Sequence, residues 1–159
     1  MQPKEIVEKV EKSAPFLLFK ETHKNSFLAS LFSMFDQNEP ERWLVGYVDP
    51  SGNKYFTFVL DKGQCDYKDE NEAHENIALL DLEKVHVKLF DAIILARETL
   101  AKKTGEKTTK TIAVLQTLDQ KETWNISFMT ANFNVFNVKI DAAERNLLSE
   151  NYGGMFSQA

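Results

Sequence analysis

The sequence is poor in cysteine and glycine, and it contains no long apolar run. Its 159 residues include a single cysteine, Cys65, which excludes an intrachain disulfide and leaves too few thiolates for a cysteine-based zinc site. Only six residues are glycine, and no glycine-rich phosphate-binding loop or dinucleotide fingerprint is present. No apolar stretch approaches the roughly 20 residues that span a bilayer. We therefore expect no cofactor and no membrane span.

Basic residues are also too few for a broad nucleic-acid-binding surface. Lysine and arginine total 19, against 24 aspartates and glutamates, which gives a formal net charge of −5. A nucleic-acid or anionic-membrane partner usually needs the opposite balance, so we expect neither. The chain is 43% hydrophobic and has twelve phenylalanines, enough for the interior of one domain or of two halves that share a core.

The first residues bear on localisation. Charged side chains occur in residues 1–12, where a secretory signal peptide has its apolar region. As the chain is written, this predicts a cytoplasmic protein. A secreted or cell-envelope location is the alternative if a leader has been removed.

Two stretches share one plan, residues 43–61 and residues 124–141. In each, large apolar side chains alternate with polar or small ones on both sides of a turn, which predicts a β-hairpin with one buried face. The tryptophans lie 81 positions apart, from 43 to 124, and the closing aspartates 80, from 61 to 141. If the turns of the two hairpins differ in length by one residue, their strands align and the same positions point to the buried face in both. We interpret the pair as a repeat, with both tryptophans in the core.

Helix and strand patterns flank both hairpins. The predicted class is α+β, with two helix-plus-antiparallel-sheet repeats (α-β-β-β each). In chain order the elements are a helix at 3–13, a buried strand at 15–21, the first hairpin, a possible short strand at 64–67, a helix at 89–103, a strand at 111–117, the second hairpin and a short strand at 147–148.

One segment, at about 25–37, has no counterpart in the second half. From Phe27 onward its large apolar residues fall at i, i+1, i+4, i+5 and i+8, which predicts an amphipathic helix inserted into the first repeat. Either this helix covers the sheet, or its Phe-rich face forms part of a groove for a protein or peptide partner. The candidate partner-binding residues of the second alternative are Phe27, Leu31, Phe32 and Phe35.

The expected domain plan follows from these elements. The first repeat covers 1–68, an acidic connection covers 69–84, the second repeat covers 85–152, and 153–159 form a loose tail. The acidic run of the connection lacks the spacing and glycine turn of a Ca²⁺ loop, so we interpret it as solvated linker charge.

Residue patterns for catalysis or metal binding are weak. The three histidines lie in three different segments and form no metal-binding pair. Cys65 would need a nearby histidine to act as a nucleophile. Asp61 and Asp141, at equivalent strand ends, are best explained as turn caps. We predict no catalytic, cofactor or metal residues.

The second half carries a helix FDAIILARETLAKK, a strand IAVLQT, then WNISF, and FNVKIDA before a short apolar strand. In this order it resembles the PepSY domain, whereas the first half is less similar and has Lys62 after Asp61. The turn after Asp141 departs from the family, with Glu144 and Arg145 in place of a Thr-Gly or Ser-Gly pair. The matching residues are Ala92, Ala96, Trp124, Phe128, Val138, Ile140, Asp141 and Ala142, with Trp43, Phe58, Leu60 and Asp61 in the first half.

The resemblance implies a helix packed on a small antiparallel sheet and a noncatalytic module that restrains a peptidase or binds another protein. We therefore expect a protein- or peptide-binding module. A carrier of a small apolar ligand is one alternative, because a sheet that curves around a helix can enclose a cavity lined by phenylalanine. An enzyme that uses Cys65 or carboxylates is the other. A homodimer joined through strand edges fits all three.

Overall fold

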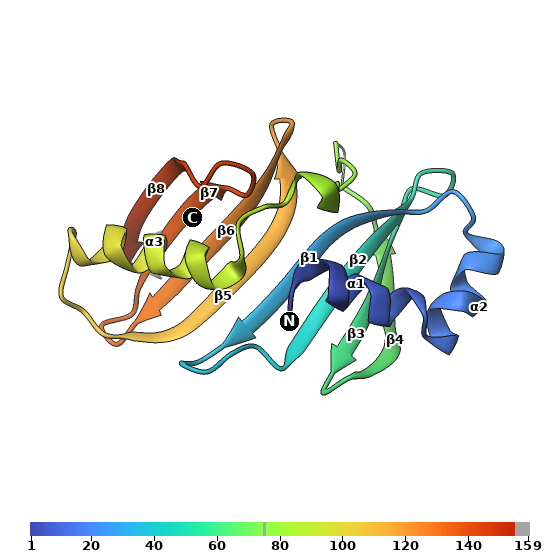
Figure 1. Ribbon diagram of the computed structural model, residues 1–159, viewed down its shortest axis with the longest axis horizontal. Helices are drawn as coiled ribbons and strands as arrows, with labels where there is room; N and C mark the ends of the chain where they lie inside the picture. Colours follow the sequence, from blue (N-terminus) through green and yellow to red (C-terminus); the bar gives the residue numbers. More distant parts are fainter. Residues whose placement is uncertain (75, 155–159) are drawn as a thin grey trace.

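The structure, a computed structural model, describes residues 1–74 and 76–154. These residues form one antiparallel sheet of eight strands in the order β4-β3-β2-β1-β5-β6-β7-β8, with three α-helices and a short 3₁₀ helix (Figure 1). The α+β class is therefore confirmed. The helices are α1 (Pro3–Glu11), α2 (Ala14–Thr22), η1 (Leu82–Lys84) and α3 (Leu89–Ala101), and the strands are β1 (Phe27–Phe35), β2 (Arg42–Asp49), β3 (Lys54–Asp61), β4 (Gln64–Glu72), β5 (Thr108–Leu118), β6 (Lys121–Thr130), β7 (Asn134–Asp141) and β8 (Leu147–Gly154).

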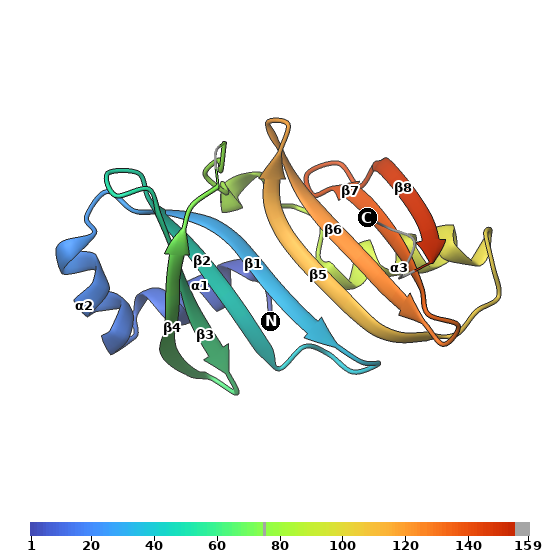
Figure 2. The ribbon, with the colours of Figure 1, turned by 180° about the vertical axis from the view of Figure 1, so that it is seen from behind.

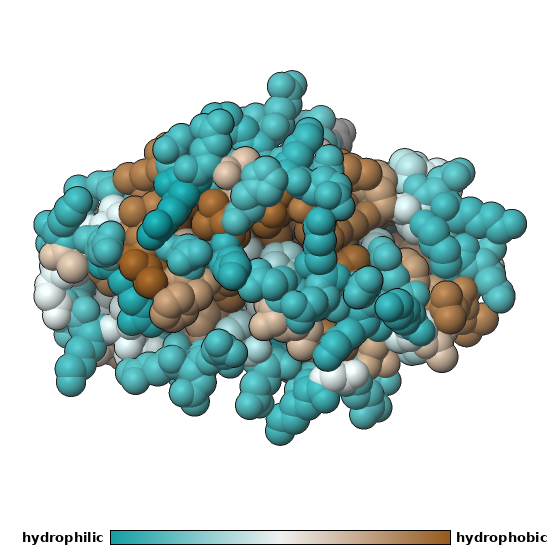
Figure 3. Space-filling view, viewed as in Figure 1, coloured by the Kyte–Doolittle hydropathy of each residue, from teal (hydrophilic) through white to brown (hydrophobic). Residues whose placement is uncertain are grey.

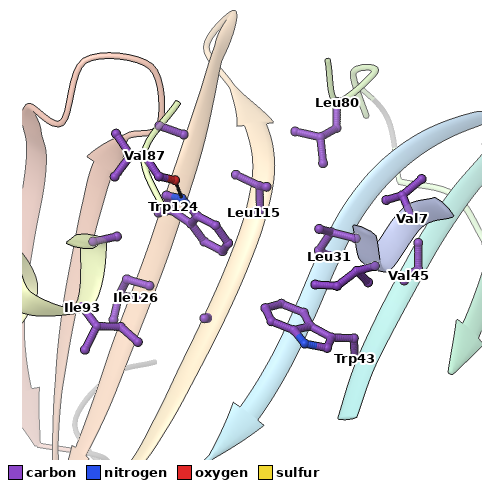
Figure 4. Close-up of a cluster of buried hydrophobic side chains, with 14 of the residues drawn as sticks. Val7, Leu31, Trp43, Val45, Leu80, Val87, Ile93, Leu115, Trp124 and Ile126 are labelled. Atoms are coloured by element: carbon purple, nitrogen blue, oxygen red, sulfur yellow. Dashed lines mark hydrogen bonds between the residues drawn. The ribbon is translucent and has the colours of Figure 1, made fainter. Parts of the chain in front are cut away.

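The three α-helices pack on the same face of the sheet and bury one continuous apolar layer. Strands β2, β3, β5, β6 and β7 contribute every second residue to this layer, as the period of a pleated strand requires. Figure 4 shows Trp43 and Trp124 within it, on either side of the strands β1 and β5 that join the two halves. Trp43 is 3% exposed and Trp124 is fully buried, so both tryptophans lie in the core as predicted.

The two predicted hairpins are confirmed as antiparallel pairs. Trp43 pairs with Leu60 between β2 and β3, and Trp124 pairs with Ile140 between β6 and β7. Of the two predicted turn caps, Asp141 accepts hydrogen bonds from the backbone N–H groups of residues 143 and 144. Asp61 is exposed and its side chain makes no hydrogen bond in the described part of the chain, so its predicted role is wrong.

The predicted helical insertion at about 25–37 is wrong, because Phe27–Phe35 is the central strand β1. A short apolar run satisfies the helical and the strand period at once, and periodicity cannot separate them. Leu31 is fully buried under the helices, whereas the next residue, Phe32, lies on the opposite face. The segment is apolar on both sides: Leu31 and Phe35 pack in the core under the helices, whereas Phe32 and Met34 lie on the opposite face.

The predicted strand at 15–21 is also wrong, because this run belongs to helix α2. The hydroxyl oxygen of Ser13 accepts a hydrogen bond from the Phe16 backbone N–H and caps the helix, while a proline occupies the first turn. Phe19 is buried, but Leu17 and Leu18 are 56% and 69% exposed. Figure 3 shows a brown group at the end of the molecule that α2 occupies in Figure 1.

Both outer strands are longer than predicted. β4 reaches Glu72, so the first acidic residues assigned to the connection belong to an edge strand. β8 runs to Gly154 and includes two glycines that were assigned to a loose tail. The described part of each half therefore has four strands instead of three, and the first half has two helices. Glu75 of the predicted acidic run and residues 155–159 of the predicted tail lie outside the described residues.

Candidate functional site

The face of the sheet opposite the helices is largely bare. Among the described residues no α-helix lies on this face, which Figure 2 shows toward the viewer. The connection after β4 covers one end of it, where Ala73 and Ile77 pack against Ala29 and Val48. The remainder is open along the whole width of the sheet.

Apolar side chains gather in the middle of this bare face. The strand register places Val59, Leu44, Phe32 and Val114 side by side in one row across four strands. Met34 and Ile112 form the adjacent pair, and Met34 is 49% exposed whereas the other five are half-buried. We call these six residues the bare-face band: Phe32, Met34, Leu44, Val59, Ile112 and Val114.

Polar residues border the band at both ends of the row. On one side the register continues to Asn125 and Lys139, and on the other it ends at Asp66 on the edge strand. The amide nitrogen of Asn137 donates to the side-chain oxygen of Asn125 and, over 2.9 Å, to the hydroxyl of Ser127. An apolar centre with a polar rim is the usual anatomy of a protein interface.

A tyrosine closes the band toward the covered end of the face. Tyr55 on β3 reaches across β2 to Ser30 on β1, and their hydroxyl oxygens are 2.5 Å apart. Burial raises the pKa of Tyr55, so the phenol stays neutral at physiological pH.

The candidate residues from the sequence do not form one surface. Leu31 is fully buried in the core, and Phe35 packs against that core from the helix side. Only Phe27 and Phe32 lie on the bare face, and Phe27 packs at its covered end. Sequence reasoning missed the band residues of other strands, although Leu44 interrupts the alternation of β2 with an apolar side chain at an outward position.

A second polar group lies at the far end of the first half. The Nδ1 atom of His23 is 2.7 Å from Oδ2 of Asp49, and Asp49 also accepts hydrogen bonds from the backbone N–H and the hydroxyl of Ser51. These bonds, first that of the Ser51 hydroxyl and then that of His23, lower the pKa of Asp49 to about 2. The serine is bonded to the carboxylate and not to the imidazole, so this is not the geometry of a serine nucleophile.

Cys65 lacks the surroundings of a reactive thiol. It is half-buried, and burial raises the pKa of its thiol, with nearby Asp66 acting in the same direction. Activated cysteines show the opposite shift, produced by a neighbouring cation or helix N-terminus. In residues 1–74 and 76–154 no group of three His, Cys, Asp or Glu side chains is arranged to hold a metal ion.

Every helix within the described residues is too short or too polar to cross a bilayer.

No family model matches the chain, and no curated protein has significant sequence similarity to it. Its structure is similar to the crystal structure of a "putative lipoprotein" from Clostridium difficile 630, with a TM-score of 0.55 and 18% sequence identity. The similarity covers 86% of this chain and 89% of that chain. At this identity the likeness shows a shared fold alone.

Proposed function

We propose that this protein is a noncatalytic binding module that holds a protein or peptide partner against the bare-face band. One observation carries the proposal: all three described α-helices cover the same side of an eight-stranded sheet, and the other side presents six apolar side chains in its centre. Contiguous exposed apolar surface with a polar rim is typical of an interaction site.

The dimensions of the face suit such a partner. Eight strands with seven spacings of about 4.8 Å are about 34 Å wide, and eight residues along a strand extend about 26 Å. The planar area of the whole face is therefore about 880 Å², of the same order as the roughly 800 Å² of accessible surface that each partner contributes to a standard interface, and the connection after β4 covers one end of it. The band lies over the four strands in the centre of this area, where interfaces have their buried core.

We further propose that the protein consists of two PepSY-like units that share one sheet. We also propose that its partner is a peptidase or a related protein. The matching pairs of Trp43 with Leu60 and Trp124 with Ile140 support the first part. The second part rests on the family resemblance. The similarity to a "putative lipoprotein" supports a location at the cell envelope.

Site-specific photo-crosslinking tests this proposal. A photoreactive phenylalanine analogue at position 32 should give one discrete adduct, identified by mass spectrometry, whereas the same analogue at Phe133 should not. Phe133 is a matched control because it is 63% exposed in a turn distant from the band. Leu44→Lys should then weaken binding of the purified partner at least tenfold while the circular dichroism spectrum stays unchanged.

Three results would contradict it. Equal adducts from positions 32 and 133 would show that the band has no preferred partner, and unchanged affinity in Leu44→Lys would place the contact elsewhere. An adduct with twice the mass of the chain would identify a second copy as the occupant of the band and exclude a different protein there.

A further inference from the structure

A pocket lies on the helix side of the sheet, between α3 and the connection from β1 to β2. Its volume is about 420 Å³, which is within the range of small-molecule sites. Phe35 and Trp43 line it from the sheet, and Leu89, Phe90 and Ile93 line it from α3. Phe90 is 69% exposed at the rim. Polar and charged side chains complete the lining, so the pocket is amphipathic, and the sheet separates it from the bare-face band.

The floor of the pocket contains a donor without an acceptor. Trp43 is 3% exposed, and its indole N–H has no hydrogen-bond partner among the described residues. The indole of Trp124, by contrast, donates to the Val87 carbonyl over 2.8 Å. In Figure 4 the nitrogen of Trp43 lies on the ring edge farther from Leu31, toward the end of β1. No described residue accepts a hydrogen bond from this N–H, which leaves it available to an acceptor on a ligand in the pocket.

Two cations border the same pocket. Lys88 precedes α3 and Arg97 lies nine residues further along it, and neither takes part in an ion pair in the described part of the chain. Arg97 is held above the Phe128 ring, with its guanidinium carbon 5.4 Å from the ring centroid. Glu39 is the one acidic residue of the lining. The pocket is therefore cationic in a protein whose net charge is −5.

We propose that this pocket binds an amphipathic carboxylate, such as a medium-chain fatty acid. The apolar chain would contact Phe35, Leu89 and Ile93, and a carboxylate can accept a hydrogen bond from the Trp43 indole and pair with Lys88 or Arg97. The pocket extends along α3 from residue 89 to residue 97, about 12 Å at 1.5 Å per residue, which suits an elongated ligand. This site goes beyond the proposed function and uses the opposite face of the sheet.

The two tryptophans provide a direct test, because each indole N–H gives its own signal in a ¹H–¹⁵N spectrum of the full chain. Titration with decanoate should shift the Trp43 indole signal and leave that of Trp124 in place. A Trp43→Phe variant assigns the two signals by removing one of them. A shift of the Trp124 signal alone, or of neither, would overturn the proposal.

Charge recognition is tested with ligands of equal chain length. Decanoate should bind more tightly than decan-1-ol, and decylamine no more tightly than the alcohol. Arg97→Gln should weaken decanoate binding about threefold to fivefold, the size expected for an exposed ion pair, and leave decanol binding unchanged. Arg145→Gln, at an exposed position in the turn before β8, is the matched control.

Equal affinities for the acid and the amine would exclude a carboxylate site. Leu44→Lys alters only the bare face and tests the partner site alone. A negative result with decanoate would therefore reject the pocket proposal without bearing on the proposed partner site.

Discussion

The phenol oxygen of Tyr55 lies 2.5 Å from the hydroxyl oxygen of Ser30, although strand β2 runs between the two strands that carry them. The side chain crosses β2 at Gly46, where a Cβ atom would lie only 1.8 Å from the tyrosine oxygen. A glycine in the interior of a strand is normally destabilising, and close approach of another group is one reason for its presence. Gly46 therefore permits a contact that joins three strands on the bare face.

Replacement of Gly46 by alanine should destabilise the protein by about 1–3 kcal/mol. The new methyl group displaces the phenol ring, so the hydrogen bond to Ser30 and the packing over β2 are lost. Urea unfolding measures this change. Gly52→Ala is the control, because a Cβ there meets only the Lys54 side chain at an ordinary 3.6 Å. The double variant Tyr55→Ala/Gly46→Ala should lose less stability than the sum of the two single variants, because both changes disrupt the same contact. If the losses were additive, the clash with Tyr55 would not explain the effect of Gly46→Ala.

Trp124→Phe should cost about 1 kcal/mol more than Trp43→Phe. Both substitutions remove a similar apolar volume from the core, but only the first leaves a buried carbonyl, that of Val87, without its donor. Val87 lies two residues before α3, and the protection of its backbone N–H, which donates to the Ala142 carbonyl, from hydrogen exchange should fall only in the first variant. Equal unfolding free energies for the two variants would show that the hydrogen bond contributes nothing measurable.

These tryptophans also show how far the sequence could predict the fold. Alternation of large apolar and polar residues located both hairpins and placed Trp43 and Trp124 in the core, because a half-buried strand has a period that no helix shares. What alternation could not show was the difference between the two indoles. The Val87 carbonyl reaches Trp124 through tertiary packing 37 residues away in the chain.

The errors have physical causes as well. β1 and α2 are short apolar runs, and such runs are compatible with either a helix or a strand until their neighbours are known. Ser13 caps α2 and Pro15 lies in its first turn, and a cap followed by a first-turn proline is the local signal that distinguishes this helix from a strand. The bare-face band was not predictable, because its row exists only once β1 pairs with both β2 and β5.

Substitution of Asp49 should remove a contribution to stability that depends on pH. Its pKa is about 2 in the folded protein, against an ordinary value of 3.8, because Ser51 and His23 donate hydrogen bonds to the carboxylate. Between pH 2 and pH 3.8 the unfolded chain binds more protons at this carboxyl than the folded protein does. The stabilisation by Asp49 is therefore complete above about pH 4 and is lost as the pH falls toward 2. Urea unfolding from pH 5 to pH 2 should show wild type and Asp49→Asn converging at the acidic end. A constant difference across this range would contradict the assignment, and Asp61→Asn, at an exposed carboxylate, is the control.

Truncation of Leu31 and of its neighbour Phe32 in β1 should affect different properties: the first mainly stability, the second mainly partner binding. Leu31 is fully buried under the helices, so Leu31→Ala should cost about 2–5 kcal/mol through lost burial and a residual cavity. Phe32 is the larger side chain, yet it is half-buried on the bare face, and Phe32→Ala should cost less than Leu31→Ala. Chemical denaturation of both variants measures the two costs. In the binding assay the order should reverse, with Phe32→Ala weakening partner binding while Leu31→Ala, at a temperature where it is folded, does not. A larger stability loss at Phe32 would mean that this residue belongs to the core and that the bare-face band is not a free surface.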